Sequence, residues 1–124
     1  MANKKKAEES TQHDLVVCDL EFPRLGEELV ELEMDELEQV ERTIGKIHRM
    51  TWEQIYKTSS KSQKRGLNLE PIPGQKTASG KAIASIRISD KFRARVCRDG
   101  KVMRFISLHP DHDSAYDEGG GESL

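Results

Sequence analysis

Residues 81–109, KAIASIRISDKFRARVCRDGKVMRFISLH, decide the fold of this chain. The stretch holds three runs rich in apolar and β-branched residues, which we expect to form strands near 82–89, 92–98 and 101–109. An Asp99–Gly100 pair separates the last two runs, and this dipeptide is a strong signal for a two-residue hairpin turn. The stretch therefore predicts an antiparallel meander.

The residues before the meander alternate between strand and helix patterns. HDLVVCDLEF predicts a strand near 14–22. Apolar residues then recur at steps of three to five, which predicts a long amphipathic helix over 25–48 with acidic residues on its opposite face. Thr51 is a suitable N-cap for a second helix over 51–59.

The segment 61–80, KSQKRGLNLEPIPGQKTASG, has two prolines and three glycines and predicts a basic loop. The resulting order is strand, helix, helix and three strands. It predicts an α+β fold in which two helices pack on one face of a small, mostly antiparallel sheet.

Length and composition indicate one domain. The chain has 124 residues, of which 35% are hydrophobic and 34% charged. We expect a disordered lead over 1–12, a single domain over 13–117 and a flexible tail over 118–124. No apolar run is long enough to span a bilayer and no signal peptide is evident, so a soluble, cytoplasmic protein is expected.

The two cysteines give no sign of a metal site. Cys18 and Cys97 stand far apart and match no zinc spacing, so we expect reduced, partly buried thiols. The sequence predicts neither a metal nor another cofactor.

Charge is distributed unevenly along the chain. Residues 1–50 hold 7 Lys/Arg and 13 Asp/Glu, whereas residues 51–112 hold 13 Lys/Arg and 5 Asp/Glu. Strand alternation places Arg87, Arg93 and Arg95 on the same face of the meander. A solvated sheet surface explains any one of them, whereas three on adjacent strands favour phosphate binding, because a guanidinium offers paired donors and stays charged.

Titratable residues gather where the last strand ends. The segment 108–116, LHPDHDSAY, contains His109, Asp111, His112, Asp113 and Tyr116. Two histidines without a further ligand are a weak metal signature, while histidine titrates near neutral pH and suits general acid–base chemistry. Ordinary surface histidines are the alternative interpretation.

These features resemble the RelE/ParE superfamily of bacterial toxin–antitoxin toxins. The similarity covers about residues 13–117. Its most specific part is the segment ISDKFRARVCRDGKVMRFISLHPDHDSAY, in which a Phe-Arg-x-Arg strand, a hairpin and an apolar strand precede His-Asp-x-x-Tyr. The resemblance implies a RelE-like fold and, in the ribonuclease branch, cleavage of messenger RNA in the ribosomal decoding site without a metal.

The resemblance also implies roles for individual residues. Arg95 and Arg87 would hold the scissile phosphate, His112 would move a proton, and Tyr116 would orient or stack against a base. Further substrate-binding residues would lie beside them, namely Arg93, Lys91 and His109.

Three functions stay open on the sequence. The first is a ribosome-dependent mRNA endonuclease held silent by a cognate antitoxin, whose acidic segment would cover the basic face. The second is a toxin of the ParE kind, which inhibits DNA gyrase without nuclease activity. The third is a degenerate, non-toxic binding module of the same fold.

Overall fold

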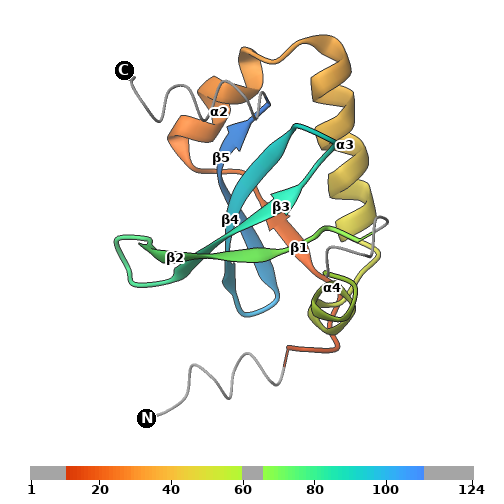
Figure 1. The fold of residues 1–124 in the computed structure, drawn as a ribbon, viewed down its shortest axis with the longest axis vertical. Helices are drawn as coiled ribbons and strands as arrows, with labels where there is room; N and C mark the ends of the chain where they lie inside the picture. Colours follow the sequence, from red (N-terminus) through yellow and green to blue (C-terminus); the bar gives the residue numbers. More distant parts are fainter. Residues whose placement is uncertain (1–10, 60–65, 111–124) are drawn as a thin grey trace.

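A five-stranded open sheet forms the centre of the computed structural model, which describes residues 11–59 and 66–110 (Figure 1). Its strands are β1 (Val17–Asp19), β2 (Glu70–Lys76), β3 (Ala82–Arg87), β4 (Arg93–Asp99) and β5 (Val102–His109), and they lie in the order β1-β5-β4-β3-β2. β1 runs parallel to β5, and every other neighbouring pair is antiparallel. The predicted α+β class with a mostly antiparallel sheet is confirmed.

The predicted meander corresponds to β3, β4 and β5. Asp99 pairs with Val102, so the two-residue turn between β4 and β5 is Gly100–Lys101, one residue later than the predicted pair. Gly100 adopts a φ of 62°, which glycine reaches without the steric cost that a Cβ imposes. The aspartate therefore closes the ladder and the glycine makes the turn.

Residues 11–59 and 66–110 form three helices where the sequence predicted two. They are α2 (Pro23–Val30), α3 (Met34–Ile47) and α4 (Trp52–Lys57). The predicted cap of α4 is present, because the Gln54 backbone N–H donates to Thr51 Oγ1 at 3.2 Å and the Thr51 N–H donates to Gln54 Oε1 at 2.9 Å.

The single long helix predicted over 25–48 is wrong, because it is divided between α2 and α3. Glu33 is extended, and its backbone N–H donates to the side chain of Glu36 at 2.9 Å, which starts a new helix. The five-residue step from Leu32 to Leu37 marks this break in the sequence. Because the chain breaks between α2 and α3, α2 lies along β5 and α3 contacts β1.

The loop predicted over 61–80 is also wrong in part, because residues 70–76 form β2. Pro71 and Pro73 have no N–H to donate to a neighbour, and this is tolerated because β2 is an edge strand. Gly74 has a φ of 78°, and the β2–β3 register shifts between Pro71 and Lys76. Prolines that suggested a loop thus belong to an irregular sheet edge.

The core lies between the three helices and one face of the sheet. Cross-strand register places Ile86, Ala94 and Leu108 in one row on this face. The helices supply Leu25, Val40, Ile47, Trp52 and Ile55 to the same buried cluster. The opposite face, called here the outer face, carries the polar residues of β3, β4 and β5 other than Arg98. No helix in the described part of the chain is both long and apolar enough to cross a membrane.

Arg98 joins the helical layer to the hairpin. Its guanidinium lies 4.7 Å from the centroid of the Trp52 ring and donates to the Tyr56 hydroxyl at 3.2 Å. It also donates to Thr11 Oγ1 at 3.0 Å and to Gln12 Oε1 at 3.4 Å. This arginine therefore supports the fold at the turn end of the hairpin.

Replacing Phe105 with alanine tests the core. The Phe105 side chain is fully buried, so Phe105→Ala is expected to lower the free energy of unfolding by about 3–5 kcal/mol. Urea denaturation followed by circular dichroism measures this loss. The control Val30→Ala changes a side chain that is 85% exposed and should stay within about 0.5 kcal/mol of the parent. Equal effects of the two substitutions would contradict the assigned core.

Candidate functional site

The outer face brings arginines, serines and a histidine into two neighbouring rows. In the first row Arg87 pairs with Arg93, and Arg93 pairs with His109. In the second row Arg95 lies between Ser85 and Ser107. The register therefore places Arg87, Arg93 and Arg95 on one face, as strand alternation predicted.

The turn end of the outer face is electrically balanced. Arg104 Nε lies 2.8 Å from Asp19 Oδ2, and Arg104 Nη1 lies 3.2 Å from Asp99 Oδ2. Lys81 Nζ lies 3.3 Å from Asp99 Oδ1. The hydrogen bond from Arg104 is the main reason that the pKa of Asp19 falls below its usual value. These cations serve the fold, and the opposite end of the face is where basic residues predominate.

His109 is the titratable residue at that opposite end. Its Nε2 lies 2.9 Å from Ser107 Oγ, and the ring is partly buried. Burial lowers the pKa of His109, the charge of Arg95 lowers it further, Glu28 raises it and Arg24 lowers it. The imidazole is therefore neutral at pH 7 and able to accept a proton.

Helix α2 supplies part of the surroundings of His109. β1 pairs only with Val102, Met103 and Arg104 of β5, so the rest of that edge is open to α2. Glu28 Oε1 accepts the backbone N–H of Leu108 at 2.7 Å, and Glu28 Oε2 accepts Arg24 Nε at 2.9 Å. This carboxylate both caps the open edge of β5 and acts on the neighbouring imidazole.

The basic residues of the outer face have different surroundings. Arg93 Nη1 donates to the carbonyl oxygens of Ser89 and Asp90 at 2.7 and 3.0 Å, so this residue braces the β3–β4 turn. Arg95 Nη1 donates to Gln75 Oε1 of the edge strand β2 at 3.3 Å. Lys91 lies exposed in the β3–β4 turn. Among the arginines of the outer face, Arg95 is the one whose charge lowers the pKa of His109.

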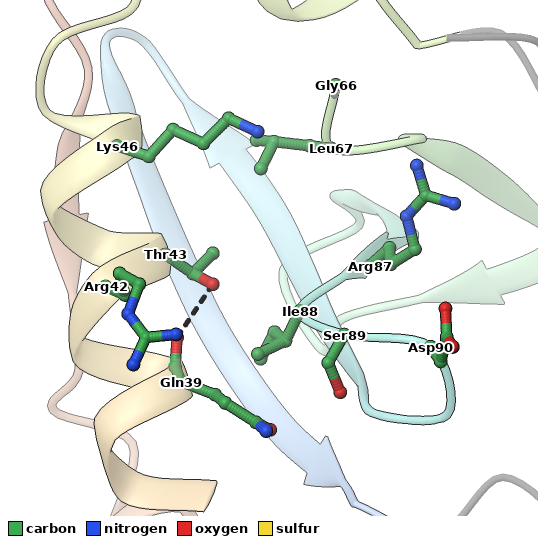
Figure 2. A pocket seen from close by; sticks show the side chains of 10 residues that line it. All are labelled: Gln39, Arg42, Thr43, Lys46, Gly66, Leu67, Arg87, Ile88, Ser89 and Asp90. Atoms are coloured by element: carbon green, nitrogen blue, oxygen red, sulfur yellow. Dashed lines mark hydrogen bonds between the residues drawn. The ribbon is translucent and has the colours of Figure 1, made fainter. Parts of the chain in front are cut away.

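Arg87 borders a pocket of about 420 Å³ between α3 and the end of β3 (Figure 2). Arg42 and Lys46 of α3 line the same pocket. Burial lowers the pKa of Lys46, and the charge of Arg87 lowers it further. This cavity, called here the α3–β3 pocket, adds two cations that the sequence analysis did not single out.

Two predicted site residues, His112 and Tyr116, lie outside the described residues. Among the described site residues, His109 lies near Arg95, whereas Arg87 borders the α3–β3 pocket at the end of β3. Sequence reasoning missed Ser107, although its spacing of two from His109 on a strand indicates a shared face. Sequence reasoning also missed Glu28. This segment of the chain contains many acidic residues, and the sequence does not show which carboxylate contacts the sheet.

The described residues provide neither a metal site nor a reactive thiol. Within residues 11–59 and 66–110, no three His, Cys, Asp or Glu side chains converge on a point that could hold a metal ion. Burial raises the pKa of Cys18 to about 12 and is the main cause of the raised pKa of Cys97. Both thiols are therefore protonated at neutral pH and weak as nucleophiles.

No protein-family model matches this chain, and no curated protein or solved structure is significantly similar to it. The proposed function therefore rests on the geometry of the outer face.

Titration of His109 by NMR tests the electrostatics of the site. Its pKa is expected below 6.5, the ordinary value. Arg95→Gln should raise this pKa by removing a neighbouring cation, whereas Glu28→Gln should lower it while keeping an oxygen for the Leu108 N–H. The control Arg49→Gln removes a cation just beyond the end of α3 that is not among the groups acting on His109, and it should leave the pKa unchanged. Shifts in the reverse directions would contradict the assigned neighbours.

The same pKa makes stability depend on pH. Because folding lowers the pKa of His109, the unfolded chain binds the proton more tightly, and His109 favours folding above pH 6.5. This contribution is lost as the pH falls below 6.5 through the folded-state pKa. Melting temperatures measured from pH 8 to pH 5 should therefore fall more steeply for the parent protein than for His109→Gln. Parallel curves would contradict the lowered pKa.

Proposed function

We propose that this protein is a metal-independent messenger RNA endonuclease of the RelE/ParE toxin kind, acting on the ribosome. The observation that carries the proposal is the placement of the His109 imidazole on the outer face, in one row with Arg93 and beside Arg95 and Ser107. The charge balance of that face adds support, because ion pairs neutralise its turn end and leave the basic residues at the end near His109. A polyanion is attracted to such a face by its phosphates.

The residue types suit cleavage of RNA through its own 2′-hydroxyl. The 2′-oxygen attacks the adjacent phosphorus, the bond to the 5′-oxygen breaks, and a 2′,3′-cyclic phosphate and a 5′-hydroxyl result. One group must take the 2′-hydroxyl proton, another must give a proton to the 5′-oxygen, and a cation must stabilise the phosphorane.

The described residues suit two of these three tasks. A neutral His109 is suited to take the proton, and Arg95 is suited to stabilise the phosphorane. Ser107 orients the ring through the contact at Nε2. His112 and Tyr116 keep their predicted roles, the first as an acid–base group and the second as a stacking platform for a base.

The proposal includes a protein partner. Toxins of this kind are held silent by an antitoxin, and the outer face favours an antitoxin segment rich in acidic residues. Contacts between exposed charges are screened by salt, so the complex should weaken as ionic strength rises.

The decisive experiment combines induction in bacteria with mapping of transcript ends. The parent protein is expected to arrest growth and to produce new 5′ ends within coding regions. Arg95→Gln and His109→Gln should reduce cleavage about a hundredfold to ten-thousandfold, since each removes a group that acts on the reacting atoms. The control Lys101→Gln removes an exposed cation from the turn at the other end of the sheet and should cleave normally.

Other outcomes overturn the proposal or reassign its residues. Full cleavage by folded Arg95→Gln and His109→Gln would exclude this site. Growth arrest with intact transcripts and reduced DNA supercoiling would identify a gyrase inhibitor instead. Loss of cleavage in His112→Gln but not in His109→Gln would place both proton transfers on residues after β5.

A further inference from the structure

The α3–β3 pocket gathers positive charge from two separate elements. Arg42 and Lys46 are four residues apart and so lie on one face of α3, and Arg87 reaches the pocket from β3 (Figure 2). Asp90 is the one carboxylate among the lining residues. The lining thus carries three cations against one anion.

The wall opposite α3 fixes the position of Arg87. The Arg87 backbone N–H donates to the carbonyl oxygen of Leu67 at 2.7 Å. Gly66 comes just before it and packs so tightly that a Cβ there would lie 2.1 Å from the Thr58 carbonyl oxygen. The backbone bond to Leu67 and the close packing of Gly66 thus connect the Arg87 end of β3 to the end of α4.

The cations of the pocket act on one another. Lys46 is partly buried, and burial together with the charge of Arg87 lowers its pKa. An anion bound between Lys46 and Arg87 would reduce the repulsion between these two like charges. The arrangement therefore favours a ligand with concentrated negative charge.

The volume and lining of the pocket restrict the class of ligand further. About 420 Å³ exceeds what one phosphate group fills and falls within the range of small-molecule sites. Leu67 and Ile88 add apolar surface beside the cations, and Ile88 points toward α3 (Figure 2). A phosphate with its attached sugar or base matches this combination of charge and apolar surface.

We propose that the α3–β3 pocket binds a nucleotide unit of an RNA strand through its phosphate, apart from the bond that is cleaved. The inference rests on the proposed function, because Arg87 connects the pocket to the row of Arg93 and His109 on the outer face. A strand crossing from α3 over β3 and β4 to β5 would meet the pocket first and His109 last. The pocket residues Arg42 and Lys46 contribute affinity and register, and the outer face performs the chemistry.

Binding of a non-cleavable RNA tests the inference. Fluorescence anisotropy would measure the affinity of a labelled 2′-O-methyl RNA of eight nucleotides for the full chain at several salt concentrations. Arg42→Gln and Lys46→Gln are each expected to weaken binding about fivefold to tenfold, and each should reduce the salt slope by about 0.7, the value for one lost phosphate contact on a single strand. Arg49→Gln is the matched control, because Arg49 follows the same helix outside the pocket and should bind RNA like the parent.

Cleavage kinetics and competition by inorganic phosphate provide two further tests of the pocket. Arg42→Gln should raise KM while leaving kcat within about twofold, and its melting temperature should match that of the parent. Inorganic phosphate should compete with the RNA for the parent protein. Unchanged RNA affinity in both pocket variants, with weakened binding in Arg95→Gln, would overturn the pocket while leaving the proposed function intact.

Two outcomes point to other ligands. Failure of the parent protein to bind the RNA would overturn both the proposed function and the RNA assignment of the pocket. If an acidic peptide, and not RNA, lost affinity on Arg42→Gln and Lys46→Gln, the pocket would be a protein-docking site and the inference would be wrong.

Discussion

The pairing of β4 with β5 is the constraint on which the rest of the structure depends. It fixes which side chains face the helices, because a slip of one residue would turn every side chain to the other face. Val96 pairs with Phe105 and Ala94 with Leu108, so these apolar residues meet the core together. Arg95 and Ser107 are then placed together on the outer face, beside His109.

A shift within this pairing also matters for the site. The β4–β5 register shifts between Arg95 and Val96, so one strand carries an extra residue at that point. Phe105 and Leu108 can therefore both face the core although three positions separate them. The strand ends with Ser107 and His109 directed to the outer face, where α2 supplies Glu28. Packing and the arrangement of the candidate site thus depend on the same irregularity.

Local patterns in the sequence were enough to predict the meander, its hairpin and α4. Alternation, a glycine turn and a threonine cap are each encoded within a few residues. The break between α2 and α3 was harder to predict, because acidic residues fill both helices and the residue type of Glu33 does not indicate its extended backbone. β2 was missed because its prolines are tolerated only at a sheet edge, and the sequence does not show which strand is the edge.

The candidate site was likewise predictable only where its features are encoded locally in the sequence. Strand alternation predicted the shared face of Arg87, Arg93 and Arg95, but their different surroundings depend on contacts between distant segments. Arg93 bonds to a neighbouring turn, Arg95 meets Gln75 of the missed strand, and Arg87 borders the α3–β3 pocket. Glu28 lies 80 positions from Leu108 in the sequence, so no local pattern could have connected them.

We propose that this protein meets RNA on the outer face, at the end near His109. NMR chemical-shift mapping of the labelled full chain with a non-cleavable RNA tests it most directly. RNA binding at this end of the sheet should give the largest shifts at the backbone amides of Arg95, Ser107 and His109, with a decline toward Gly100. Shifts confined to α4 and the Gly100–Lys101 turn would place the RNA elsewhere, and the absence of shifts would exclude RNA binding.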